Sequence, residues 1–97
     1  MPSLGHSAPG KPPRNVPLVK DPLVIGRGQD CDLVLEDNNL SRRHCQIRRT
    51  SGQFRLEDLQ SKNGTFVNGR RVEWAELAPG DLITIGDQML VFKKDDK

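Results

Sequence analysis

Residues 41–69 read SRRHCQIRRTSGQFRLEDLQSKNGTFVNG, and this stretch decides the fold. Apolar and polar residues alternate over 44–49 and again over 54–57, so each segment predicts a strand with one buried face. The dipeptide Ser51-Gly52 separates the two segments, and its turn chemistry favours a tight connection between antiparallel strands. The sequence therefore predicts a β-hairpin at its centre.

Two polar clusters, at 41–44 and 61–65, flank this hairpin, and Gly26-Arg27-Gly28 ends an apolar run upstream. Together they place four cations beside hydroxyls and amides in predicted loops: Arg27, Arg42, Arg43 and Lys62. Such cations form strong, charge-assisted hydrogen bonds with anions. The clusters therefore predict a small anion site, for which a phosphate group is the natural candidate.

The remainder of the chain is also typical of a β protein. Short apolar runs at 23–25, 33–35, 82–85 and 89–92 are bounded by turn residues, and only 73–78 has helical character, enough for one turn. About eight short strands without a long helix predict an all-β, antiparallel two-sheet sandwich. In such folds the loops at one end carry the function.

The ends of the chain differ in composition from the middle. Residues 1–17 hold five of the seven prolines, which predicts a flexible, Pro/Gly-rich lead-in that lends at most an edge strand near 16–20. We expect the folded domain over 18–93 and a charged tail over 94–97.

Composition excludes several classes of function. A net charge of +2 from 15 basic and 13 acidic residues, without a pattern of stacking aromatics, argues against nucleic-acid binding. No apolar run can span a membrane, and no Cys/His spacing predicts a metal site. Residues 1–10 contain no apolar run typical of a secretory signal, so we expect an intracellular protein, cytoplasmic or alternatively nuclear. The two cysteines, Cys31 and Cys45, are accordingly interpreted as reduced thiols, buried or half-buried.

The motifs resemble those of the forkhead-associated (FHA) domain. They occur in the family's order: Gly26-Arg27, then Ser41-Arg42-Arg43-His44, then Asn63-Gly64-Thr65 followed by Asn68-Gly69. Asp30 to Leu33 and the Leu77 to Gly86 segment agree with the family as well. The family usually opens with an apolar strand, whereas residues 4–10 have the composition of a poor strand, which predicts a first strand that is either weak and irregular or missing.

The resemblance implies a β-sandwich that is not an enzyme, needs no cofactor and binds phosphothreonine through its end loops. It implies a monomeric domain of a larger protein. The partner would be a phosphothreonine-containing protein or peptide, or the host chain itself, in signalling linked to a Ser/Thr kinase or its substrates.

The resemblance also assigns roles to individual residues. Arg27, Ser41, Arg42 and Lys62 would bind the phosphate, with the lysine side chain equally able to extend into solvent, and Asn63 would bind the peptide backbone.

Five further residues would support the site structurally: Gly26, His44, Gly64, Thr65 and Asn68. A catalytic role for His44 with the serine three residues earlier is disfavoured, because the sequence has no nucleophile elbow and no evident oxyanion hole. No residue is assigned to catalysis or to a metal.

One alternative stays open. Five arginines fall outside the predicted site: Arg48, Arg49, Arg55, Arg70 and Arg71. They allow a phosphate-independent docking or autoinhibitory scaffold, which phosphatase treatment of the partner would distinguish from a phosphate-dependent module.

Overall fold

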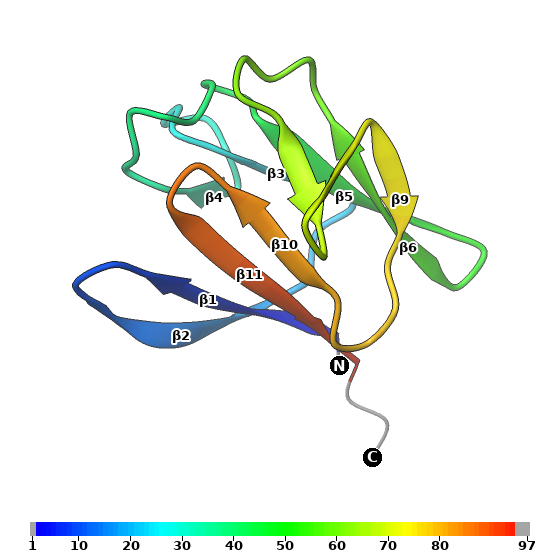
Figure 1. Cartoon of the computed structure of the whole chain (residues 1–97). Coiled ribbons are helices and arrows are strands. Elements are labelled where there is room, and N and C mark those ends of the chain that lie inside the picture. Colours follow the sequence, from blue (N-terminus) through cyan, green and yellow to red (C-terminus); the bar gives the residue numbers. More distant parts are fainter. Residues whose placement is uncertain (1, 95–97) are drawn as a thin grey trace.

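The computed structural model describes residues 2–94 and shows two β-sheets packed face to face (Figure 1). The strands are β1 (Ser3–Ala8), β2 (Lys11–Pro17), β3 (Leu23–Gly26), β4 (Leu33–Val34), β5 (Cys45–Thr50), β6 (Gln53–Asp58), β7 (Thr65–Val67), β8 (Arg70–Val72), β9 (Trp74–Glu76), β10 (Leu82–Ile85) and β11 (Gln88–Lys93). One sheet has the order β2-β1-β11-β10-β7-β8 and the other β4-β3-β5-β6-β9. All recorded pairings are antiparallel except β3 with β4. The predicted all-β sandwich is confirmed.

The central hairpin forms as the sequence indicates. Strands β5 and β6 pair from Cys45 opposite Asp58 to Thr50 opposite Gln53. Both turn residues adopt positive φ, 51° at Ser51 and 80° at Gly52, which is the geometry of a two-residue hairpin turn.

The N-terminal segment differs from the predicted flexible lead-in. Strand β1 pairs with both β2 and β11, and Leu4 is fully buried in the core. Three prolines of the segment lie in β2, an edge strand, where a missing N–H breaks no ladder on the outer side. The expected irregularity is present as a register shift between His6 and Ala8. Residues 3–17 are therefore part of the six-stranded sheet.

A second difference concerns residues 73–78. The structure places strand β9 there, paired with β6, in place of the predicted helical turn. A short segment gains more from extending a sheet than from one isolated helical turn, because helix nucleation is unfavourable. Leu77, just beyond β9, is buried, and Ala75 packs against the core.

The core lies between the two sheets and is mostly aliphatic. Phe54 and Phe92 meet across it, with ring centroids 5.5 Å apart. Both cysteines are free and buried, and burial raises the pKa of the Cys45 thiol to about 12. This core fixes the strand ends from which the polar loops emerge. Within the described residues, no helix has the length and apolarity needed to cross a bilayer.

Strand ends at one pole of the sandwich carry the loops of interest. The end of β3, the start of β5 and the end of β6 are aligned by register, since Ile25 pairs with Cys45 and Cys45 with Asp58. The start of β1 and the end of β11 lie at the opposite pole (Figure 1). Of the predicted tail, 94–97, only Lys94 lies within the described residues.

Candidate functional site

The loop after β3 lies against the loop before β5 through main-chain contacts. The Arg27 N–H donates to the Ser41 carbonyl at 3.2 Å, and the Gly28 N–H donates to the Arg42 carbonyl at 3.0 Å. A Cβ on Gly26 would lie 2.1 Å from the same Arg42 oxygen. Only glycine permits this approach, so Gly26 sets how closely the two loops meet.

The side chain of His44 joins the loop before β5, called the second loop, to the loop between β6 and β7, called the third loop. The residue is fully buried, and its main-chain N–H donates to the Ile25 carbonyl at 2.8 Å. Its ring Nδ1 accepts from the Ser41 N–H at 3.2 Å, so Nε2 carries the proton and donates to the Gly64 carbonyl at 2.8 Å. Both ring nitrogens are thus occupied by backbone groups, and neither is free to act as a general base.

Ser41 and Asn63 make direct contacts between the second and third loops. The Lys62 N–H donates to the Ser41 hydroxyl oxygen at 3.0 Å, which leaves the hydroxyl proton free to be donated outward. The Asn63 side-chain amide donates to the Asn39 carbonyl at 2.8 Å, which leaves its own carbonyl oxygen as an acceptor. The two loops therefore present both a donor and an acceptor at their junction.

The third loop is held by Asp58, which the sequence did not identify as a support. Its carboxylate accepts from the Ser61 hydroxyl at 2.5 Å, the Ser61 N–H at 3.1 Å and the Thr65 hydroxyl at 2.7 Å. Burial alone would raise the pKa of Asp58, but these hydrogen bonds outweigh it and lower that pKa. The Ser61 hydroxyl oxygen in turn accepts from the Gly64 N–H at 3.0 Å. Asp side chains commonly bond backbone N–H groups of the turn that follows them, and this tendency is the signal that could have revealed the support.

A second carboxylate, Asp37, holds the segment that leads into Ser41. It accepts from the Asn39 N–H at 2.8 Å, the Asp87 N–H at 2.9 Å and the Gln88 side chain at 3.1 Å. Burial would raise its pKa, and the hydrogen bonds lower it. The loop before β5 is thereby fastened to the turn between β10 and β11.

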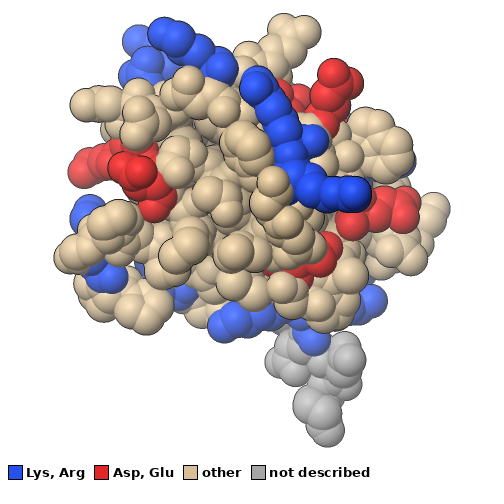
Figure 2. Space-filling view, viewed as in Figure 1, with Lys and Arg blue, Asp and Glu red and all other residues tan. Residues whose placement is uncertain are grey.

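The predicted cations lie at this pole. The Arg27 Nε donates to the Leu40 carbonyl at 2.7 Å, which orients the guanidinium and leaves its two terminal amino groups for a ligand. Arg42 and Lys62 are exposed, and within residues 2–94 neither side chain makes a recorded hydrogen bond or ion pair. Figure 2 shows Lys and Arg atoms at the top of the view, with others at its left side and along the bottom. The positive charges of Arg42 and Lys62 are therefore available to an anionic ligand.

Among the predicted support residues, Asn68 stands apart from the site. It lies in the turn between β7 and β8 with φ of 51°, and its side chain bonds Asp81 at 3.0 Å and the Leu82 N–H at 3.0 Å. These contacts join it to the start of β10, whereas the loops described above lie near Gly86, beyond the other end of β10. Asn68 therefore shapes a distant turn.

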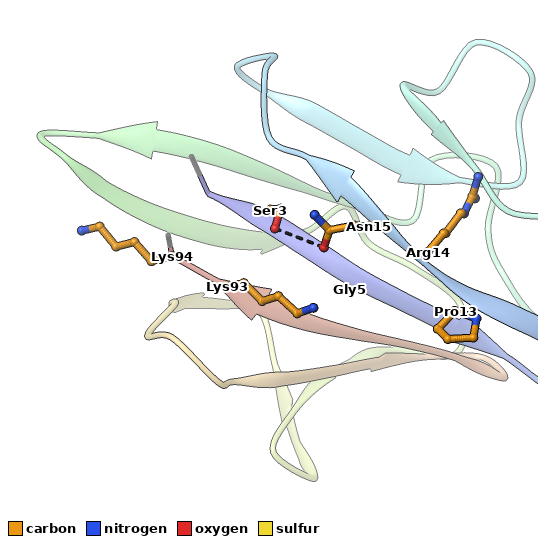
Figure 3. Close-up of a pocket in the computed structure, with 7 residues that line it drawn as sticks. All are labelled: Ser3, Gly5, Pro13, Arg14, Asn15, Lys93 and Lys94. Atoms are coloured by element: carbon orange, nitrogen blue, oxygen red, sulfur yellow. Dashed lines mark hydrogen bonds between the residues drawn. The ribbon is translucent and has the colours of Figure 1, made fainter. Parts of the chain in front are cut away.

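A pocket of about 620 Å³ lies elsewhere, on the six-stranded sheet beside β1, β2 and the end of β11 (Figure 3). Its cations are Arg14, Lys93 and Lys94, and the Arg14 Nε already donates to the His6 ring at 3.1 Å. This pocket shares no residue with the three loops. In the described part of the chain, no cluster of His, Cys, Asp and Glu could hold a metal ion.

Fold and site together define a β-sandwich binding domain whose end loops present a cationic, hydrogen-bonding surface. The chain belongs to the FHA domain family, whose model matches residues 23–86.

Curated relatives share this region. The glycogen accumulation regulator GarA of Mycolicibacterium smegmatis is 45% identical over 75 residues, which cover 73% of this chain and 48% of GarA. The ABC transporter ATP-binding/permease protein Rv1747 of Mycobacterium tuberculosis is 47% identical over 68 residues, covering 70% of this chain and 8% of that protein. The chain thus spans less than half the length of these two relatives.

Solved structures match the whole sandwich. The FHA domain of FhaA, complexed with the intracellular domain of Rv3910, has a TM-score of 0.86 and 35% identity, covering 96% of this chain and all of that one. Mycobacterium tuberculosis EmbR, in complex with a low-affinity phosphopeptide, also has a TM-score of 0.86 and 35% identity, covering 95% of this chain and 24% of that one.

Proposed function

We propose that this domain binds phosphothreonine in a partner protein or in its own host chain. The observation that carries the proposal is the junction of the three loops. Arg27 and Ser41 are joined by a main-chain bond at 3.2 Å, and Ser41 and Lys62 by a bond at 3.0 Å, so the groups assigned to the phosphate meet at one place. Two solved relatives of similar fold support it, since one is named in complex with a phosphopeptide and the other with a partner domain.

The chemistry of recognition follows from these contacts. A phosphothreonine brings a charge of about −1.5 to −2 and three strong acceptor oxygens. The free amino groups of Arg27 form a fork suited to two of those oxygens, and the Ser41 hydroxyl donates to a third. Arg42 and Lys62 are exposed and add positive charge, and the free carbonyl oxygen of Asn63 accepts from a peptide N–H.

Selectivity for phosphate follows from what is lost without it. An unmodified threonine offers no charge to the exposed cations, so the charge-assisted bonds disappear. Each hydrogen bond to a charged group contributes about 1.5–3 kcal/mol. Preference for phosphothreonine over phosphoserine rests on one methyl group, for which a fitted pocket provides about 1–3 kcal/mol.

The setting of the module is part of the proposal. We place it in kinase-linked signalling inside the cell, supported by the free thiols of Cys31 and Cys45. We favour the cytoplasm over a nucleus because the curated relatives above are bacterial proteins. Its action is binding, with no catalytic residue and no cofactor.

Calorimetry with phosphothreonine, phosphoserine and threonine peptides tests the proposal. We expect Arg27→Ala to weaken phosphothreonine binding about 10- to 100-fold, and Arg27→Lys to weaken it as well, because lysine keeps the charge but loses the fork. Arg49→Ala is the matched control, since Arg49 stacks on Phe54 at 5.4 Å, toward the far end of β5. Unchanged affinity of Arg27→Ala would refute the site, and equal affinity for the threonine peptide would favour the phosphate-independent scaffold.

A further inference from the structure

His6 is a buried polar residue that the sequence motifs did not include. It lies in β1 and is 6% exposed. The Arg14 Nε of β2 donates to its ring Nδ1 at 3.1 Å, and Nδ1 must accept because a guanidinium can only donate. The proton therefore sits on Nε2, which donates to the Gln88 Oε1 of β11 at 2.6 Å. The side chain of His6 thus links three neighbouring strands of the six-stranded sheet.

The bond to His6 also fixes the orientation of the Gln88 amide. Gln88 is buried, and its amide nitrogen donates to the Asp37 carboxylate at 3.1 Å. An ionised carboxylate only accepts, so the amide nitrogen must face Asp37 and the amide oxygen must face His6. Every donor and acceptor between the two residues is therefore matched. Neither His6 nor Gln88 can turn away without leaving a buried polar group unpaired.

The hydrogen bonds continue from Asp37 to Asn63. Asp37 accepts from the Asn39 N–H at 2.8 Å, and the Asn39 carbonyl accepts from the Asn63 side-chain amide at 2.8 Å. Asn39 is exposed, so burial of its own side chain does not hold it in place. Within residues 2–94, the bond to Asn39 is the one recorded hydrogen bond of the Asn63 side chain. The direction of the free Asn63 carbonyl oxygen therefore depends on where Asp37 holds Asn39.

We propose that His6 is a positioning residue of the phosphothreonine site. Through Gln88 and Asp37 it holds the second loop so that the Asn63 carbonyl oxygen meets the peptide backbone. The inference rests on the proposed function. His6 and Gln88 both lie outside residues 23–86, the part of the chain that the family model matches, so this support is separate from the family's motifs. The β1–β2 hairpin thereby contributes to binding without touching the ligand.

Calorimetry on the full chain tests the inference. The probes are a phosphothreonine peptide selected from a degenerate pool and the same peptide with unmodified threonine. His6→Ala removes the donor to Gln88, His6→Gln keeps a donor at nearly the same place, and Gln88→Met removes both bonds of the amide. Ser3→Ala is the matched control, because Ser3 is 7% exposed on the same strand and its hydroxyl bonds Asn15 of β2 at 3.3 Å (Figure 3). Both control residues line the pocket that shares no residue with the three loops.

Each variant is made in three backgrounds: wild type, Asn63→Ala and Lys62→Ala. In the wild-type background we expect His6→Ala and Gln88→Met to weaken phosphothreonine binding about tenfold. His6→Gln and Ser3→Ala should change it less than about twofold. The loss should be absent from the Asn63→Ala background and undiminished in the Lys62→Ala background, because only Asn63→Ala removes the group that His6 positions.

A spectroscopic measurement separates a change of position from a loss of stability. In a nitrogen–proton correlation spectrum without ligand, His6→Ala and Gln88→Met should shift the Asn39 amide and Asn63 side-chain amide signals, and Ser3→Ala should leave them in place. Urea unfolding gives the folded fraction of each variant, by which the affinities are corrected. Gln88→Met keeps the test decisive if His6→Ala does not fold.

Unchanged affinity of both His6→Ala and Gln88→Met overturns the inference. An equal loss in the Asn63→Ala background also overturns it, because the substitution would then loosen the fold in general. Asn39 and Asn63 signals that stay in place in both variants count against it in the same way. If the wild-type chain binds the phosphothreonine peptide no better than the threonine peptide, the proposed function fails before any variant is compared, and the inference fails with it.

Discussion

Replacing Gly26 with alanine tests whether close backbone contact between the first two loops builds the site. The φ of Gly26 is not in the left-handed region, so the penalty is entirely steric. The new Cβ would lie 2.1 Å from the Arg42 oxygen, 2.8 Å from the Arg42 carbonyl carbon and 3.0 Å from the His44 nitrogen. All three atoms belong to the backbone, so no side-chain rotation relieves the clash.

The size of the effect follows from the distances. An ordinary contact of a Cβ begins at 3.4 Å, so the Arg42 oxygen must move by more than 1 Å. That movement removes its 3.0 Å bond from the Gly28 N–H and strains the 3.2 Å bond between Arg27 and Ser41. Each lost bond costs about 0.5–1.5 kcal/mol, and overpacking adds about 1–3 kcal/mol. We expect Gly26→Ala to lower the free energy of unfolding by about 2–5 kcal/mol.

Gly5→Ala is the matched control within the same protein. Its Cβ would meet only the end of the Lys93 side chain, at 3.0 and 3.1 Å, and that flexible chain can move away. Urea unfolding should show little change for Gly5→Ala, and calorimetry should show intact phosphothreonine binding. Gly26→Ala should lose both stability and affinity. If Gly26→Ala were as stable as Gly5→Ala and bound the peptide equally well, the argument that this contact aligns Arg27 with Ser41 would be wrong.

Three further variants separate support from ligand contact. His44→Ala leaves the Ser41 N–H and the Gly64 carbonyl unpaired, so we expect a loss of about 2–4 kcal/mol in urea unfolding, and an unchanged midpoint would contradict it. The lowered pKa of Asp58 means that its stabilisation is complete above the ordinary carboxylate pKa and is lost as pH falls through the folded value. Asp58→Asn should therefore flatten the acid side of the stability profile, and an identical profile would count against the network. Lys62→Ala keeps the main-chain bond to Ser41, so affinity should fall less than tenfold with a weaker salt dependence, whereas a loss as large as that of Arg27→Ala would show a direct contact.

Turn and strand chemistry made the centre of the fold predictable. The Ser51-Gly52 turn, the alternation on either side of it and the closing hairpin of β10 and β11 are local signals, and the structure contains all three. The edges were not predictable in the same way. Strand β2 contains prolines and β9 is three residues long, and each is stabilised by a neighbouring strand distant in sequence. A local pattern cannot report such a neighbour.

The residues of the candidate site also fall into those that local sequence signals predicted and those that they did not. The motif residues were visible because short spacings place them in turns, and the structure brings Arg27, Ser41, Lys62 and Asn63 to one pole while Asn68 lies elsewhere. Asp58 carried only a local turn signal, and it was not predicted as the residue that holds the third loop. Its hydrogen-bond donors, Ser61 and Thr65, belong to the connection between β6 and β7. The geometry of that connection depends on the two strands lying in different sheets, which a local sequence pattern does not show.

The hydrogen bonds and close contacts of the loops explain why the motifs contain both residues with free polar groups and residues that only support the loops. Arg27, Ser41 and Asn63 carry donors or acceptors that the fold does not use, whereas Gly26 and His44 are buried in contacts with the backbone. An exposed cationic surface gains little from burial, so its geometry must come from bonds beneath it. The His44 ring bonds the backbone of Ser41 and of Gly64, and so it holds the two loops that carry the proposed binding groups. We therefore expect affinity for the phosphopeptide to depend on the stability of these loops.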